Sequence, residues 1–383
     1  NSTTTNRADI TIAAITGGSN TLTLTTENNV TGSDVTASGA ISGVTTLTLA
    51  SVGGTATLSA DVDVTTLAVD NTVLNVAFTG NGSSVVDAVA FANDGTLILG
   101  ASGGTQTYNG GLTTTSVGGT VTLNGSIVTS NDAVVLGAVT LASATTIDTN
   151  SSDTTGDITI GAVTGGSNSL TLSTGDNVAN TDISASGAIS GVTTLTLSDV
   201  GGTATLSGDV DVTTLAVDNT VLNVAFTGNG SSVANSFTPA NDGTFIFGAS
   251  GGTQTYNGGL NTASVGSTVT LNGSLVTSDD ALTLGAATLA SDVTLTSAGG
   301  AISTGAITGT STDDLIVTSS GGSTNTISLG AIGGSGNVHN ITATAGTSIA
   351  LTGNVTTSNN SGNTVSLTAP SINIGSVTID TNN

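Results

Sequence analysis

Short segments in which polar and apolar residues alternate recur along the whole chain. In the first of them, at 21–24, Thr alternates with Leu, and the same pattern returns at 46–49. A period of two places every second side chain on the same face of a β-strand. We therefore predict a strand at each such segment. The other segments of this first series are 66–69, 96–99, 120–123, 138–141 and 157–160.

The alternation also assigns side chains to the core or to solvent. Because burial on one face fixes the register, a shift of one residue would reverse every assignment. The side chains predicted to point inward are Leu22, Leu24, Leu47, Leu49, Leu67, Val69, Leu97, Leu99, Val121 and Leu123. Those predicted to point outward are Thr21, Thr23, Asp61 and Asp63.

Clusters of Gly, Asn, Ser and Asp separate these segments and predict turns rather than helices. They lie at 17–20, 53–54, 80–82, 103–104, 118–119 and 131–132. Short strands with frequent turns fit either a string of β-sandwiches or a coil of parallel strands. The strand segments return at a mean spacing of roughly 21 residues, which favours the coil because one rung of that length holds three short strands. We therefore predict an all-β chain that forms an elongated parallel β-helix, or β-solenoid.

The chain repeats itself at a distance of 148 residues. Tyr108 and Tyr256, the only two tyrosines, each lie in the hexapeptide Thr-Tyr-Asn-Gly-Gly-Leu, and 61–85 recurs unchanged as 209–233. Repetition of so long a unit is typical of a protein that supplies length and surface, because a catalytic pocket is needed only once. The predicted parts of one continuous solenoid are a first long repeat at 1–157, a second at 158–300 and a divergent, partial third at 301–383.

Composition excludes several classes of protein and partner. Most of the long and charged residues that favour helices are missing, while 54 Gly and many β-branched residues are present. A hydrophobic content of 36% is enough to bury a core, which argues against disorder. The net charge is −24 with a single cation, Arg7, so we predict binding neither to nucleic acid nor to an anionic membrane. No apolar run approaches the roughly 20 residues of a membrane span, which excludes membrane insertion.

Several phrases carry a family resemblance. They are Gly-Asp-Ile-Thr-Ile-Gly-Ala-Val-Thr-Gly at 156–165, Thr-Gln-Thr-Tyr-Asn-Gly-Gly at 105–111 and Val-Val-Leu-Gly-Ala-Val-Thr-Leu at 134–141. With them the chain resembles, over nearly its whole length, the repeat region of filamentous-haemagglutinin-type bacterial surface adhesins. The resemblance implies a right-handed parallel β-helix that is exported as an adhesin or a fibre, and it transfers no functional residue. No signal peptide is visible, and the start at Asn1 indicates a processed or excised segment.

Two pairs of carboxylates are the strongest candidates for chemistry. Asp61 and Asp63, and their repeats Asp209 and Asp211, alternate with valines, so each pair is predicted to lie on one strand face about 7 Å apart. That spacing suits glycoside hydrolysis or a hard cation. We favour a solvated strand face with the valines in the core. An enzyme that acts on acidic polysaccharides would need cations, and the chain has only Arg7.

We predict no cofactor, and calcium is the alternative. Acidic residues fall in turns, for example Asp279 and Asp313, but the nonapeptide of calcium-binding β-rolls does not recur.

His339 has no second His or Cys with which to hold a metal ion, so we interpret it as a loop residue. We interpret Tyr108 and Tyr256 as packing residues, with a sugar-binding platform as the alternative.

These observations predict an extracellular structural or adhesive protein of the cell surface that is not an enzyme. The alternatives are a calcium-stabilised surface protein, a polysaccharide-acting enzyme and an ice-binding protein. Outward Thr-x-Thr pairs favour ice binding, but the unequal spacing of the strand segments is expected to prevent these threonines from forming a regular array. Neither 1–9 nor 372–383 resembles a helical cap, so the expected partner is a second copy end to end or neighbouring repeats of a longer chain. Surface glycans are a further candidate partner.

Overall fold

The computed structural model describes residues 7–26, 31–150, 152, 155–175, 179–322, 325–360 and 362–381. Over these residues the chain is all-β and contains no helix, and its parallel strands stack as a β-solenoid of about 16 turns with a spacing of roughly 22 residues. The predicted fold class is thereby confirmed. The chain divides into two compact units: unit 1 holds Asn1–Thr193 and Ser198–Gly202, and unit 2 holds Thr194–Leu197 and Thr203–Asn383.

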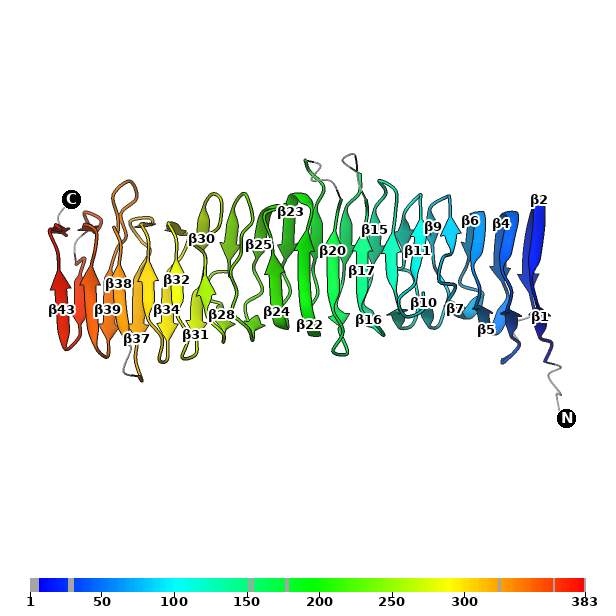
Figure 1. Ribbon diagram of the computed structural model, residues 1–383, viewed down its shortest axis with the longest axis horizontal. Helices are drawn as coiled ribbons and strands as arrows, with labels where there is room; N and C mark the ends of the chain where they lie inside the picture. Colours follow the sequence, from blue (N-terminus) through cyan, green and yellow to red (C-terminus); the bar gives the residue numbers. More distant parts are fainter. Residues whose placement is uncertain are drawn as a thin grey trace. The chain divides into compact units, whose positions relative to one another are not determined.

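In unit 1 the strands of successive turns lie side by side (Figure 1). They pair in parallel and form three ladders. Ladder one contains β1 (Ile10–Ile12), β3 (Val35–Ala37), β5 (Val52–Leu58), β7 (Val73–Phe78), β10 (Leu97–Leu99), β13 (Val121–Leu123), β16 (Val139–Leu141) and β19 (Val163–Thr164). Ladder two contains the first halves of β2 (Ile15–Thr25), β4 (Ile41–Ala50) and β6 (Val62–Val69), then β8 (Ser84–Val85), β11 (Thr105–Tyr108), β14 (Ser126–Val128), β17 (Thr145–Asp148) and β20 (Leu170–Ser173). Ladder three contains the second halves of β2, β4 and β6, then β9 (Val89–Ala90), β12 (Leu112–Thr113), β15 (Val134–Leu136), β18 (Ile158–Ile160) and β21 (Ile183–Ala185).

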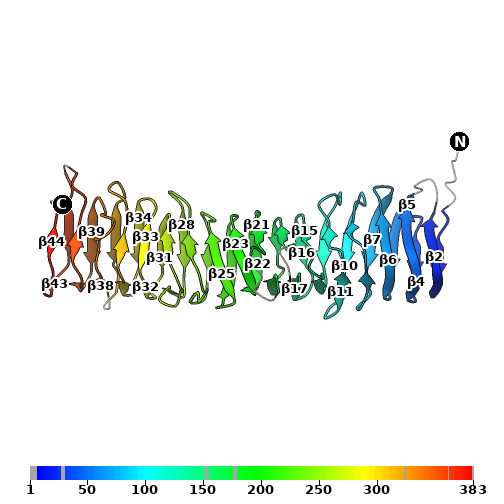
Figure 2. The same ribbon diagram turned by 90° about the horizontal axis from the view of Figure 1, so that it is seen from above.

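Unit 2 is built in the same way, and β32, β33 and β34 follow one another around one of its turns (Figure 2). Its first ladder contains β24 (Val210–Val217), β26 (Ser232–Val233), β28 (Thr253–Tyr256), β31 (Ser274–Thr277), β34 (Val293–Ser297), β37 (Leu315–Ser319), β39 (Ile341–Ala345) and β42 (Val365–Thr368). Its second contains β29 (Leu260–Asn261), β32 (Leu282–Leu284), β35 (Ile302–Thr304), β38 (Thr326–Leu329), β40 (Ser348–Leu351) and β43 (Ser371–Ile374). Its third contains β25 (Val221–Phe226), β27 (Phe245–Phe247), β30 (Val269–Leu271), β33 (Ala287–Leu289), β36 (Ile307–Thr308), β41 (Val355–Thr356) and β44 (Ile379–Asp380). The chain passes between the units within β22 (Ile189–Ser198) and β23 (Val200–Leu206).

The core lies inside each turn and consists of the apolar residues of the alternating strands. Of the ten side chains predicted to point inward, nine are buried, and Leu22 is half-buried. Leu22 pairs with Leu47 of the following turn, and no described strand covers it from the other side. Of the four side chains predicted to point outward, Thr21, Thr23 and Asp63 are exposed and Asp61 is half-buried. Removing these apolar side chains from water is the main force that holds the turns together.

Two of the predicted turns are wrong, because strands continue through them. The Gly-Gly-Ser-Asn cluster lies inside β2, where Gly18 and Ser19 have φ of 57° and 65° and bend the strand from ladder two into ladder three. The pair Gly53-Gly54 lies inside β5, and a Cβ atom on Gly54 would clash with the Asp34 carboxylate of the preceding turn. At this position glycine permits close contact between turns rather than a reversal of the chain.

The 148-residue repeat and the turn do not have the same period. Seven steps along ladder one lead from Ile10 to Val163. Ile158, the repeat of Ile10, lies five residues before Val163 and pairs with Val134 in ladder three. One repeat therefore corresponds to about six and two-thirds turns, so the second copy begins on a different side of the solenoid from the first.

Candidate functional site

The candidate carboxylates Asp61 and Asp63 lie at the start of β6, with Val62 and Val64 buried between and after them. Each carboxylate accepts a backbone N–H group from the next turn. Gly82 N lies 2.8 Å from Asp61 Oδ1, and Ser84 N lies 3.2 Å from Asp63 Oδ1. These two carboxylates therefore join one turn to the next.

The repeats of these carboxylates occupy equivalent positions in unit 2. Asp209 Oδ1 accepts the N–H of Gly230 at 2.8 Å, and Asp211 is exposed and pairs in register with Ser232. Both copies thus place their carboxylates on the outward side of a strand. The structure brings neither pair together with a histidine or a third carboxylate, since the described residues contain no group of three or more His, Cys, Asp or Glu that could hold a metal ion.

Contacts of this kind form continuous series at the corners of the solenoid. In unit 2, Asp292 Oδ1 accepts the N–H of Asp314 at 2.9 Å, and Asp314 Oδ1 accepts the N–H of Asn340 at 3.1 Å. Asn340 Oδ1 then accepts the N–H of Thr364 at 2.9 Å. One side chain per turn therefore satisfies a backbone donor that the strand ladders leave free at the corner. These contacts give the acidic residues and the asparagine of this corner a structural role.

His339 belongs to the same corner. Its Nδ1 atom lies 2.9 Å from Asp314 Oδ1 and 3.0 Å from the Nδ2 atom of Asn340. The neighbouring Asp313 is buried, and its Oδ2 atom accepts the N–H of Thr310 at 2.9 Å. The interpretation of His339 as a loop residue therefore agrees with its position, and its partners are the groups that connect the turns.

The two tyrosines lie in the core, so the alternative interpretation as sugar platforms is wrong. Tyr108 and Tyr256 are both 0% exposed. The Tyr108 ring lies 6.5 Å from that of Phe78, and the Tyr256 ring stacks on Phe237 at 5.8 Å. Burial raises the pKa of both phenols well above their ordinary value of 10.0, because a phenolate would be desolvated in this core.

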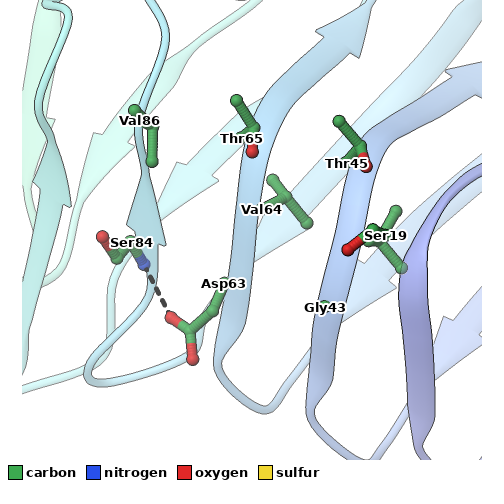
Figure 3. Close-up of a pocket in the computed structure, with 9 residues that line it drawn as sticks. Ser19, Gly43, Thr45, Asp63, Val64, Thr65, Ser84 and Val86 are labelled. Carbon is green, nitrogen blue, oxygen red and sulfur yellow. Dashed lines mark hydrogen bonds between the residues drawn. The ribbon is translucent and has the colours of Figure 1, made fainter.

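A groove of about 410 Å³ crosses four turns on the surface of unit 1 (Figure 3). Its floor contains Val44 and Val64, which are inward residues of β4 and β6. One wall carries Thr45, Thr65 and Val86 on successive turns. The opposite wall is formed by an outward row that contains Asp63 and Ser84, and Ser19 and Gly43 close the end nearest β2.

At the end of the groove nearest β2, the backbone conformation of Gly43 leaves open space. Gly43 has a φ of 65° and lies at a register shift between β4 and β6, so the wall there lacks a side chain.

The groove was not predicted from the sequence. The signal available in the sequence is Val86, an apolar residue at an outward position, whose exposed fraction is 51%. Isolated apolar residues on a protein surface are common, so Val86 by itself does not indicate a groove.

The described residues contain no helix that is long and apolar enough to cross a membrane. The sequence matches no protein-family model, and it matches neither a curated protein nor a solved structure.

Proposed function

We propose that this chain is an extracellular structural and adhesive surface protein. In this proposal the β-solenoid is a stiff shaft of the kind found in filamentous-haemagglutinin-type adhesins. The observation that supports it most directly is that polar side chains form hydrogen bonds between successive turns. The carboxylates of Asp61, Asp292 and Asp314 accept backbone N–H groups of the next turn, so they stabilise the stack of turns. Hydrogen bonds of this kind between turns make the stack of turns stiff.

The proposal assigns the chain no catalytic role. Polysaccharide cleavage would require cations to bind an acidic substrate and to stabilise developing charge. The chain has a single cation, and Arg7 is already paired with Asp9 and Asp34 at 3.2 and 2.6 Å. A protein without cysteine, with a net charge of −24, also suits exposed life outside the cell, where charge repulsion keeps long β-rich molecules apart.

We further propose that the chain associates end to end with a second copy or with neighbouring repeats of a longer chain. Strand β43 pairs with β40 on one side. Ile372 and Ile374 of β43 are 41% and 52% exposed, although the alternation marks them as apolar positions. Main-chain hydrogen bonds to an added strand would bury both side chains.

Electron microscopy and analytical ultracentrifugation of the purified 383-residue chain test this proposal. We expect straight rods, and we expect their length and mass to increase with protein concentration as copies join. The substitutions Ile372→Lys and Ile374→Lys should shift the sedimentation toward the monomer. Rounded particles, or cleavage of a polysaccharide by the purified chain, would contradict the proposal.

Ice binding is a second candidate, and one feature of unit 2 favours it. The unequal spacing of the strand segments predicts that outward threonines do not line up from one turn to the next. On the ladder of β34, β37, β39 and β42 that prediction is wrong, because the differences in turn length fall in the loops and leave the strands in register. An in-register column of outward threonines crosses β34, β37, β39 and β42 and consists of Thr296, Thr318, Thr344 and Thr368. Thermal-hysteresis measurement separates the two candidates: a freezing-point depression that Thr318→Tyr and Thr344→Tyr abolish would support ice binding, and its absence would exclude it.

A further inference from the structure

We propose that the groove on unit 1 binds an uncharged linear polysaccharide, which lies along the stack of turns. This inference rests on the proposed adhesive function, and it names the partner class and the site at which that partner is held.

The direction and period of the groove fit such a chain. Thr45, Thr65 and Val86 take equivalent positions on successive turns, because Val44 pairs with Val64 and Val64 pairs with Val85. Parallel strands are about 4.8 Å apart, which is close to the length of one pyranose unit in an extended polysaccharide. Successive sugar units would therefore meet an equivalent position on each turn. A compact ligand would gain nothing from this repetition.

The side chains of the groove offer both kinds of contact that a neutral sugar makes. Val64 lines the floor, and Val86 presents an apolar surface that is 51% exposed, suited to the C–H face of a pyranose ring. Thr45 and Thr65 are exposed and carry hydroxyl groups that donate and accept hydrogen bonds. Figure 3 shows these side chains on the ribbon beside Asp63.

Asp63 is the residue that we expect to orient the sugar. Its Oδ1 atom accepts the N–H of Ser84 at 3.2 Å, which holds the carboxylate at the edge of the groove. The second carboxylate oxygen is then in position to accept a sugar hydroxyl, and hydrogen bonds to an ionised acceptor are the stronger kind. The carboxylate touches the ligand in this arrangement, and no covalent step is involved.

Charge selects an uncharged glycan over an anionic one. The chain carries a net charge of −24, and its one cation, Arg7, is absent from the groove. A uronate or a sulfated sugar would approach the Asp63 carboxylate without a cation to offset the repulsion. A neutral hexose chain has no such cost.

The test is a binding titration by calorimetry with the intact chain. The probes are cellohexaose, mannohexaose and maltohexaose, with hexagalacturonate and a heparin hexasaccharide as anionic comparators. We compare the wild-type chain with Thr65→Trp, which fills the groove, and Asp63→Asn, which removes the charge on the expected acceptor. The matched control is Thr122→Trp, at an outward position of β13 outside the groove. Circular dichroism verifies that every variant folds.

We expect at least one neutral hexasaccharide to bind, Thr65→Trp and Asp63→Asn to weaken it by about tenfold or more, and Thr122→Trp to bind as the wild type does. Three results would overturn the proposal: no neutral probe binds, the anionic probes bind more tightly, or Thr65→Trp and Thr122→Trp have equal effects. None of these results bears on the shaft itself, because rods and end-to-end growth are measured without a glycan.

Discussion

The hydroxyl of Tyr108 donates a hydrogen bond to Oε1 of Gln106, two residues earlier on β11, at a distance of 2.9 Å. Both side chains point into the core, where they are 0% and 1% exposed. Gln106 Nε2 donates in turn to the carbonyl oxygen atoms of Phe78 and Gly80 at 2.8 and 3.2 Å. A closed polar network thus connects one turn to the preceding turn inside an apolar core, and it satisfies its buried groups as it does so.

The first prediction concerns this network. Tyr108→Phe leaves the Oε1 atom of Gln106 without its donor, so we expect the free energy of unfolding to fall by about 1–3 kcal/mol. Gln106→Leu removes the side-chain donor to the Phe78 and Gly80 carbonyls and the acceptor of the Tyr108 hydroxyl, so it should cost more than Tyr108→Phe, although the Phe78 carbonyl keeps the N–H of Gly100 at 2.9 Å. Chemical denaturation of both variants measures the difference.

The double variant is the control for the first prediction. Tyr108→Phe together with Gln106→Leu should cost clearly less than the sum of the single variants, because the two side chains share one network. Additive costs would contradict the role that we assign to the hydrogen bond between them. The repeat at Tyr256 and Gln254, with a hydroxyl-to-Oε1 distance of 3.0 Å, offers an independent copy of the measurement.

Alkaline pH provides the second prediction. The pKa of Tyr108 and of Tyr256 is raised above the ordinary value of 10.0 because burial opposes the phenolate. Above pH 10.0 the unfolded chain loses these protons while the folded chain keeps them, so stability falls as the pH rises. Tyrosinate absorbance should therefore appear only together with the loss of β-structure in circular dichroism. Absorbance that rises near pH 10.0 in a chain that is still folded would show that the phenols are accessible.

The alternating strands were predictable from the sequence because burial on one face leaves a direct record in the order of residues. Leu47 and Leu49 follow this rule and are buried. The network of Gln106 and Tyr108 was not predictable, because the sequence does not show which backbone carbonyl a polar residue at an inward position will contact. Gly54 was misread for a related reason: the sequence shows a flexible residue, and only the adjacent turn shows the close contact with Asp34 that requires it. The groove depends on the alignment of four turns, and unequal loops hide that alignment in the sequence.

A third prediction tests the assignment of faces within one strand. Leu49 in β4 is 0% exposed, whereas its neighbour Thr48 points outward. Leu49→Asp would bury an unpaired carboxylate and should cost about 3 kcal/mol or more, while Thr48→Asp should change stability by about 0.5 kcal/mol. Thermal melting of the two variants decides the question, and equal losses of stability would reject the register.

The fourth prediction concerns the series of contacts at the corner of unit 2. Asp314 accepts the N–H of Asn340, and its own N–H donates to Asp292. Asp314→Ala removes the acceptor, so we expect a loss of about 1 kcal/mol and faster amide exchange at Asn340. Asp314→Asn keeps an acceptor oxygen and is the matched control, with exchange close to that of the wild type. If Asp314→Ala leaves the exchange of Asn340 unchanged, the contact does not hold the turns together.

The last prediction follows from Asp9, which performs the same task at the first described turn. The pKa of Asp9 is below its ordinary value of 3.8, chiefly because Oδ1 accepts the N–H of Asp34 at 3.0 Å and also because Arg7 lies 3.2 Å away. A carboxylate whose pKa is depressed on folding stabilises the fold above its unfolded pKa, and this contribution is lost as the pH falls through the lower, folded value. The amide resonance of Asp34 should therefore shift as the pH is lowered from about 5 to about 2, as the first turn loosens. Asp9→Asn keeps an acceptor that does not titrate, so the pH-dependent change at its Asp34 amide should be smaller than in the wild type, and changes of equal size in the two chains would contradict the contact.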